Sequence, residues 1–141
     1  MLGIDDVKRV RDAGGSFAVT PAVAPSVVES ARLGFPVVAG ARTPTECVNA
    51  MEQGAVAIKL LPASLGGPPY LKALRDPLPG TPFFAVGGVG VKQMVDYFEV
   101  GAISVGLGGP LLGDAAAGGS LTQLRDRARR FPEAAALWRE G

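Results

Sequence analysis

The sequence has 141 residues, of which 48% are hydrophobic and 19% charged, and this predicts a single domain with a packed core. Its net charge of +1, with no long run of one sign, favours neither a nucleic-acid partner nor an anionic membrane surface. The chain has one cysteine, Cys47, and no histidine, which excludes an intramolecular disulfide, histidine-based metal sites and Ser-His or Cys-His catalysis.

Helix and strand patterns alternate along the chain. Apolar spacing predicts helices over residues 4–13, 25–33, 43–53, 70–75, 91–100 and 120–130, the last followed by a segment from Pro132 to Trp138. Short apolar runs predict strands over residues 17–20, 36–40, 54–62, 82–86 and 103–106. Residues 43–46, Thr-Pro-Thr-Glu, have the spacing of a capping box. Strict alternation with short loops predicts a parallel sheet in an α/β fold.

Two parallel architectures fit this alternation, an open doubly wound sheet and a (β/α)8 barrel. No G-x-G-x-x-G motif follows the first strand, so the dinucleotide-binding form lacks its fingerprint. Glycine pairs follow the last two strands, at Gly87-Gly88 and Gly108-Gly109, as they do after strands seven and eight of phosphate-binding barrels. Counting back from these loops predicts a partial TIM barrel that covers about strands four to eight and leaves two sheet edges unpaired.

A lysine, Lys59, lies in the middle of the apolar strand over residues 54–62. Such a run is typical of a strand that is buried on both faces of a parallel sheet. Burial disfavours the charged form of an amine, and a neutral lysine can act as a nucleophile that forms a Schiff base with a carbonyl substrate. Alternatively, the side chain lies near the strand end and extends to water. The strand alone leaves both interpretations open.

Six short motifs, in order and at consistent spacing, connect the chain to a known family. They are Phe17-Ala-Val-Thr-Pro21, Pro36-Val-Val-Ala-Gly40 with Thr43-Pro-Thr-Glu46, Ile58-Lys-Leu-Leu-Pro62, Tyr70-Leu-Lys-Ala-Leu74, Phe84-Ala-Val-Gly-Gly-Val89 and Gly106-Leu-Gly108. Together they resemble the pyruvate-dependent class I aldolases that cleave 2-keto-3-deoxy-6-phosphosugar acids, the KDPG and KDPGal aldolases. The resemblance implies one aldolase barrel domain over residues 1–141, N-terminally truncated because strands one to three of the family fold have no counterpart.

The resemblance implies a lyase reaction that needs no metal or cofactor. In the family, the lysine that matches Lys59 forms the Schiff base, and cleavage gives pyruvate and glyceraldehyde 3-phosphate. Pro21 and Leu61 match positions against the pyruvate end of the substrate, although strand termination and core packing explain them nearly as well. Val86 stands where gluconate-type enzymes usually carry threonine, so it resembles the galactonate-type enzymes and favours a 2-dehydro-3-deoxy-6-phosphogalactonate substrate. A strand-end valine is the alternative.

The resemblance also implies that backbone N–H groups in the two glycine loops bind the substrate phosphate. The residues concerned are Gly87, Gly88, Gly108 and Gly109. The alternative for these glycines is that they serve only tight turns.

The chain departs from the family pattern at the general base. The family's base is a glutamate on the second strand, and Glu29, Glu46 and Glu52, which fall on predicted helices, do not match it. Gly109-Pro110 replaces the serine that usually contacts the phosphate. Two alternatives to a phosphosugar-acid aldolase therefore stay open: a catalytically impaired phosphosugar-binding fragment and a 4-hydroxy-2-oxoglutarate aldolase.

Partners and location follow from composition and from the resemblance. Members of the family are commonly homotrimers, so the resemblance implies a homotrimer and a small phosphorylated keto acid as the substrate. Because the sequence shows no leader-like apolar segment and no apolar stretch near about 18 residues, we expect a cytoplasmic protein without membrane or nucleic-acid partners.

Overall fold

The computed structural model describes residues 3–140, along which strands and helices alternate as predicted. The strands are β1 (Ala18–Val19), β2 (Val37–Ala41), β3 (Ala57–Leu60), β4 (Phe83–Val86) and β5 (Ser104–Gly106). The helices are α1 (Ile4–Asp12), α2 (Pro25–Arg32), α3 (Pro44–Glu52), α4 (Gly67–Arg75), α5 (Val91–Glu99), α6 (Gly109–Leu112) and α7 (Leu121–Glu140), with a 3-10 turn, η1 (Ala115–Ala117), between the last two.

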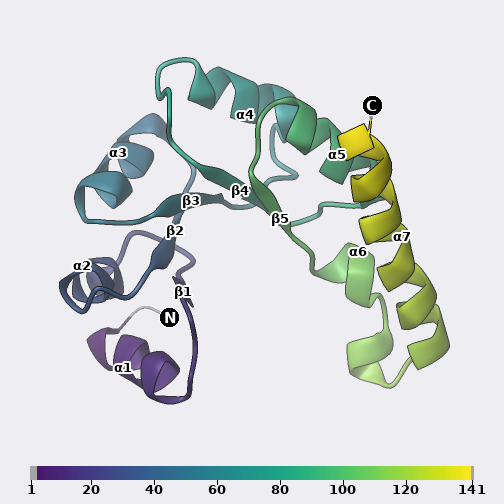
Figure 1. Cartoon of the computed structure of the whole chain (residues 1–141), viewed down its shortest axis with the longest axis horizontal. Coiled ribbons are helices and arrows are strands. Elements are labelled where there is room, and N and C mark those ends of the chain that lie inside the picture. Colours follow the sequence, from purple (N-terminus) through teal and green to yellow (C-terminus); the bar gives the residue numbers. More distant parts are fainter. Residues whose placement is uncertain (1–2, 141) are drawn as a thin grey trace.

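The strands form one parallel sheet in the order β1-β2-β3-β4-β5. Neighbouring strands are connected by helices, and α2 to α5 lie on the outer side of the arc that the sheet makes (Figure 1). The edge strands β1 and β5 do not pair with each other, so the arc is open and each end has an unpaired edge. The predicted parallel sheet with two free edges is therefore confirmed.

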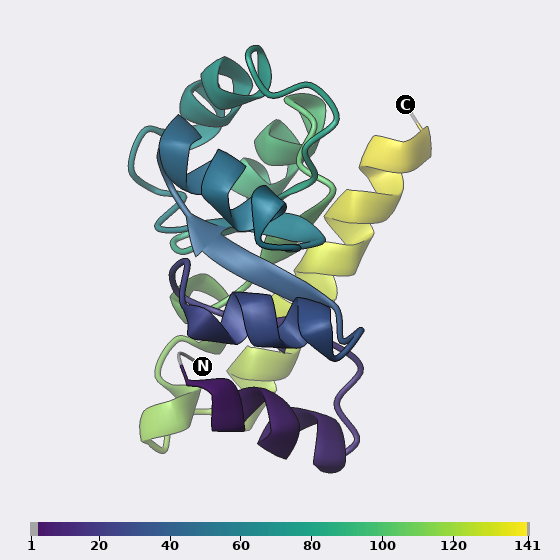
Figure 2. The same ribbon diagram turned by 90° about the vertical axis from the view of Figure 1, so that its left-hand side faces the viewer.

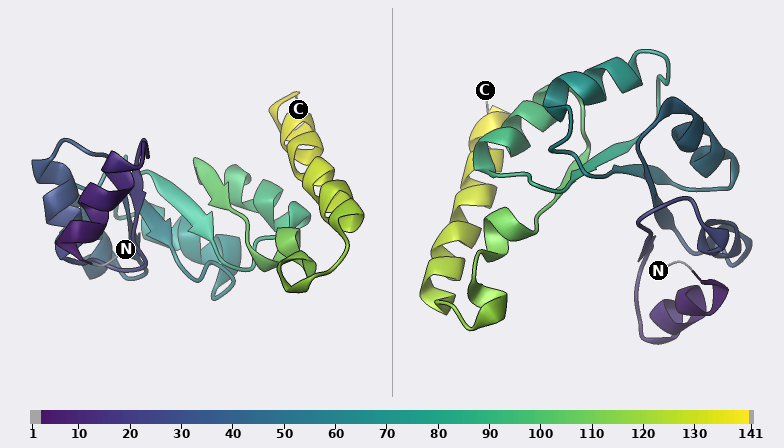
Figure 3. Two further views of the ribbon diagram at one scale, coloured as in Figure 1. Left: turned by 90° about the horizontal axis from the view of Figure 1, so that it is seen from below. Right: turned by 180° about the vertical axis from the view of Figure 1, so that it is seen from behind.

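The ends of the arc are covered by different helices. At one end, α1 packs against α2, and α1, α2 and α3 follow one another along the outer face (Figure 2). At the other end, α7 packs against α5 and α6 (Figure 3). Phe98 of α5 and Trp138 of α7 contact each other with their ring centroids 5.0 Å apart. The concave side of the arc carries no helix in the described part of the chain.

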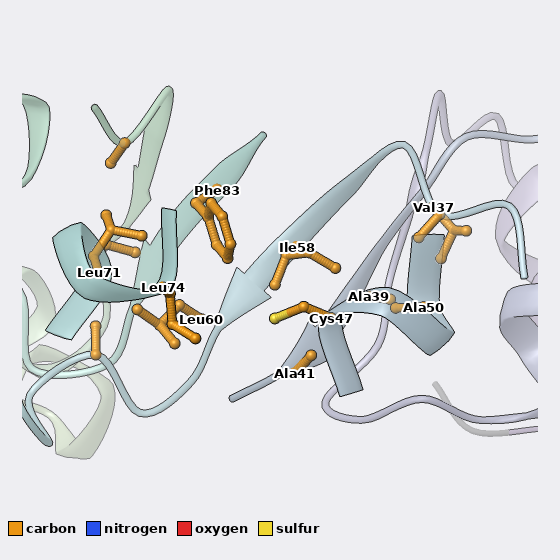
Figure 4. Close-up of a cluster of buried hydrophobic side chains, with 14 of the residues drawn as sticks. Val37, Ala39, Ala41, Cys47, Ala50, Ile58, Leu60, Leu71, Leu74 and Phe83 are labelled. Atoms are coloured by element: carbon orange, nitrogen blue, oxygen red, sulfur yellow. The ribbon is translucent and has the colours of Figure 1, made fainter. Parts of the chain in front are cut away.

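The core lies between the sheet and the outer helices. Because side chains alternate across a strand, one set of positions points into this layer. Its members are buried, and several are visible in Figure 4: Val37, Ala39, Ala41, Ile58, Leu60 and Phe83 from the strands, with Cys47, Ala50, Leu71 and Leu74 from α3 and α4. The alternate positions Lys59 and Phe84 are only half-buried. The expectation that the lysine strand is buried on both faces therefore holds for Ala57 but not for Lys59, which is half-buried on the concave side.

Three predicted elements differ most from the structure, and the short helices α6 and η1 in the stretch after β5 were not predicted. Strand β3 has four residues where nine were predicted, because Gly54 ends the preceding turn with a φ of +94°. Helix α4 begins three residues earlier than predicted, and α7 continues through Pro132 as one helix of 20 residues. Phe131, beside that proline, is 5% exposed in the core cluster, so tertiary packing keeps the helix continuous where local sequence indicated a break.

The predicted capping box begins α3. Thr43 Oγ1 accepts a hydrogen bond from the Glu46 N–H at 3.3 Å, and Glu46 Oε2 accepts from the Thr43 N–H at 2.8 Å. The same carboxylate oxygen accepts from the Arg42 N–H at 2.9 Å. These backbone donors, that of Thr43 first, hold the pKa of Glu46 below its ordinary value. The contribution of the carboxylate to stability is thus present above its unfolded pKa of about 4.3 and is lost as the pH falls through the lower folded value.

Substitution of this N-cap tests the cap directly. We expect Thr43→Ala to lower the free energy of unfolding by about 1 kcal/mol, because the Glu46 N–H loses its side-chain acceptor. The measurement is the shift of the urea midpoint at neutral pH. Thr45→Ala is the matched control, since Thr45 is exposed inside α3 and alanine is the better helix former there. Equal destabilisation by both variants would contradict the capping role.

Candidate active site

The lysine singled out from the sequence lies on the concave face of the sheet. Lys59 is the third residue of β3, and its register partners are Gly40 on β2 and Phe84 on β4. The side chain is half-buried and makes no hydrogen bond or ion pair within residues 3–140. An amine that is held on a rigid strand, beside a glycine and without a carboxylate partner, can attack a carbonyl carbon.

A shallow cavity of about 280 Å³ lies at the carboxyl ends of β1, β2 and β3. Its walls include Pro21, Gly40, Arg42 and Leu61, so two of the residues predicted to contact substrate share one cavity. Lys59 does not line this cavity, but Gly40 does and is also its register partner. The carboxyl edge of a parallel sheet is where open α/β sheets and barrels bind their ligands.

Gly40 allows the end of β1 to lie directly on β2. A Cβ atom on Gly40 would be 2.2 Å from the Pro21 carbonyl carbon, a distance that no side chain permits. Thr20 fastens this contact: its Oγ1 accepts from the Gly40 N–H at 3.3 Å and donates to the Ala22 carbonyl at 2.7 Å. Sequence reasoning assigned no role to Thr20 or Gly40. The available signal was a glycine at a strand end, which often marks a close backbone approach.

The first glycine loop packs against the segment that follows Lys59. Gly87 and Gly88 have φ angles of +101° and +75°, which favour glycine. A Cβ atom on Gly87 would lie 3.2 Å from Leu61 Cδ1, and one on Gly88 would lie 2.8 Å from Ser64 Cβ. The tight-turn interpretation therefore has a structural basis here. The Gly88 N–H donates to no backbone carbonyl in the described part of the chain, so it is available to another acceptor.

The second glycine loop is more open. A Cβ atom on Gly108 or Gly109 would meet nothing within 4 Å, so packing does not require glycine at either position. Val86, the last residue of β4, lies over β5, and a Cβ atom on Gly106 would be 2.8 Å from its Cγ2. The loops after β4 and β5 lie at neighbouring strand ends, because these strands are paired.

The other reactive groups have structural roles. Cys47 is buried in the core beside Ala41 and Ile58 (Figure 4), and burial raises the pKa of its thiol to about 11. Glu29 accepts from the Arg32 guanidinium at 2.7 and 2.8 Å, and these hydrogen bonds lower the pKa of the carboxyl. The Glu46 carboxylate belongs to the capping box. Neither carboxylate is therefore free to act as a base.

Residues 3–140 contain neither a metal-binding cluster nor a helix that could span a membrane. No group of three or more His, Cys, Asp or Glu side chains in this range could hold a metal ion. None of the described helices has the length and hydropathy needed to cross a membrane.

Comparison with known proteins gives a consistent relationship. The family model described as "KDPG and KHG aldolase" matches residues 1–122. The "Probable 2-dehydro-3-deoxy-6-phosphogalactonate aldolase" of Rhizobium meliloti (strain 1021) is 39% identical over 125 residues, 87% of this chain and 59% of the relative. The 2-dehydro-3-deoxy-6-phosphogalactonate aldolase of Escherichia coli (strain K12) is 35% identical over 136 residues, 95% of this chain and 65% of the relative. The chain thus spans about three fifths of the length of these relatives.

The structural comparison agrees. The solved structure described as "Native KDPGal structure" superimposes with a TM-score of 0.90 and 31% identity, covering 100% of this chain and 68% of that one. The predicted partial barrel is thereby confirmed: the five-stranded arc is a half-barrel that matches part of a TIM barrel.

Proposed function

The chain belongs to the KDPG and KHG aldolase family, and from that premise we propose that it acts as a class I aldolase with Lys59 as the Schiff-base nucleophile. The substrate class is a 2-keto-3-deoxy-6-phosphosugar acid, and the products are pyruvate and glyceraldehyde 3-phosphate. The observation that carries the proposal is the position of Lys59: it is half-buried on the concave sheet face, with no carboxylate or hydrogen-bond partner in the described residues.

The chemistry follows from an amine in that position. The Lys59 nitrogen adds to the C2 ketone, and loss of water gives a protonated imine. The electron pair of the C3–C4 bond then moves into the imine, which releases the aldehyde product and leaves an enamine of pyruvate. Protonation at C3 and hydrolysis return the amine and release pyruvate. With Glu29 and Glu46 engaged elsewhere, water carries the protons, and we expect turnover to be slow.

The two glycine loops complete the proposed site. Gly87, Gly88, Gly108 and Gly109 follow the adjacent strands β4 and β5, and we place the substrate phosphate on their N–H groups. Pro21 and Leu61, which share the cavity beside Gly40, are placed against the pyruvate end. Val86, together with the names of the two relatives described above, supports the galactonate epimer. The trimeric assembly of the whole protein stays a prediction, as does its cytoplasmic location.

A second candidate substrate is 4-hydroxy-2-oxoglutarate, which carries no phosphate. Two observations favour it. The matching family model includes the KHG, or 4-hydroxy-2-oxoglutarate, aldolases. Pro110 follows the open Gly108-Gly109 loop, so this loop has no serine hydroxyl to contact a phosphate. Comparing retro-aldol rates on the phosphorylated sugar acids and on 4-hydroxy-2-oxoglutarate, with pyruvate as the measured product, separates the two substrates.

Covalent trapping tests the shared chemistry. The chain is incubated with pyruvate and borohydride, and the reduced adduct is located by peptide mass spectrometry. We expect one adduct, on Lys59, and none on the other lysines, Lys8, Lys72 and Lys92. An unmodified Lys59 at saturating pyruvate would contradict the proposed function.

A further inference from the structure

Arg42 bridges two strand ends at the candidate active site. It follows β2 directly, and its guanidinium reaches the loop after β3, where Nη1 donates to the Pro62 carbonyl at 2.8 Å and Nη2 to the Leu65 carbonyl at 2.7 Å. The same guanidinium lies over the Tyr70 ring, 5.0 Å from its centroid. The Tyr70 hydroxyl in turn donates to the Arg42 carbonyl at 2.7 Å. Arg42 is therefore held from both its side chain and its backbone.

Three further hydrogen bonds connect this loop, residues 61–65, to the opposite side. The Ala63 N–H donates to the Val86 carbonyl at 2.8 Å and the Ser64 N–H to the Gly87 carbonyl at 3.0 Å. The buried Tyr97 of α5 donates to the Ala63 carbonyl at 2.6 Å. All three contacts join the loop to β4 and α5. Among the described residues, Arg42 is the one whose side-chain hydrogen bonds join this loop to the end of β2.

The loop also forms part of the cavity. Leu61 of this loop lines the cavity together with Pro21, Gly40 and Arg42. Lys59 itself is fixed by strand pairing on both sides and does not depend on this bridge. Loss of the bridge would therefore shift Leu61 relative to Gly40, the cavity residue that is also the register partner of Lys59, without moving the amine.

We infer that Arg42 is a positioning residue for the Lys59 reaction, which sets the distance between the Gly40 and Leu61 walls and so the fit of the keto acid. The inference rests on the proposed function. It requires the planar fork of arginine, because two carbonyls are bound at once and a lysine ammonium cannot reproduce that geometry. Binding of the keto acid should therefore depend on Arg42 more strongly than the chemical step does.

The test measures trapping of pyruvate on Lys59 as a function of pyruvate concentration. For Arg42→Ala we expect the half-saturating concentration to rise about tenfold, with the maximal trapping rate within about twofold of the unsubstituted chain. Arg42→Lys should not restore the half-saturating concentration. Tyr70→Phe, which removes only the hydroxyl, should shift it in the same direction by a smaller factor.

Arg75→Ala is the matched control. Its guanidinium also donates to a loop carbonyl, that of Val100 at 2.7 Å, but at the opposite end of the sheet before β5. Hydrogen exchange supplies a readout that does not need activity. Exchange should accelerate over residues 61–66 in Arg42→Ala and near residue 100 in Arg75→Ala. Only the first variant should alter trapping.

The outcomes separate the inference from the function on which it rests. An unchanged half-saturating concentration in Arg42→Ala, with normal trapping by the unsubstituted chain, would overturn the positioning role alone. A parallel fall of the maximal rate and of the melting temperature in Arg42→Ala and Arg42→Lys would also overturn it, in favour of a general structural role. No trapping by the unsubstituted chain would overturn both, whatever the exchange data show.

Discussion

Lys59→Met is expected to abolish the borohydride-trapped pyruvate adduct. The variant keeps an unbranched side chain of similar length on the concave face of β3 but has no nitrogen to add to the ketone. Lys59→Arg should be equally inactive, since a guanidinium keeps its proton at neutral pH. The measurement is intact-protein mass after trapping, followed by peptide mapping.

The controls distinguish lost chemistry from lost structure. Lys72→Met, on the exposed face of α4, should retain the full adduct. Lys59→Met should unfold at the same urea concentration as the unsubstituted chain or a higher one, because it removes a half-buried amine that has no partner in the described residues. An adduct that survives in Lys59→Met would assign the nucleophile to another amine.

Phe83→Ala is expected to give the largest loss of stability, about 3–5 kcal/mol. Phe83 begins β4, is fully buried and pairs in register with Ile58, beside which it lies in the core (Figure 4). Truncation leaves a cavity between the sheet and α4 that the surrounding backbone cannot fill. The measurement is the shift in urea midpoint, with sulfate added equally to both samples if the folded baseline is short.

Phe17 provides the comparison for Phe83. Both phenylalanines stand at the start of an apolar run, but the Phe17 side chain is 53% exposed and Phe83 is fully buried. Phe17→Ala should therefore cost less than about 1 kcal/mol. Equal losses for the two variants would contradict the difference in burial between the two phenylalanines.

This pair of residues also shows which structural features could be predicted from the sequence. The alternation of apolar runs with helical spacing, and the glycine and proline punctuation, predicted the five parallel strands and the open edges correctly. The capping box was predicted from four residues because it depends on hydrogen bonds within one turn. In contrast, both phenylalanines stand at the start of an apolar run, and only the packing of the folded chain buries Phe83 and leaves Phe17 exposed.

The candidate site divides in the same way. Lys59 could be selected from the sequence, because a lysine within an apolar run is unusual and is visible in the local pattern. Its catalytic role stays a prediction. The Arg42 bridge could not, since its partners lie 20 and 23 residues away in the chain and are backbone carbonyls, which carry no sequence signature. Thr20 and Gly40 are likewise joined only by the register of β1 on β2.

The sequence by itself determined the order of the five strands and of the helices between them, and the position of the lysine that we propose as nucleophile, because these follow from propensities and periodicities within a few residues. The tertiary structure alone decided which strand face is open, which side chains brace the loop after the lysine, and that α7 continues through Pro132. The physical reason is that register and curvature bring together residues distant in the chain, and their packing and hydrogen bonds outweigh local preference.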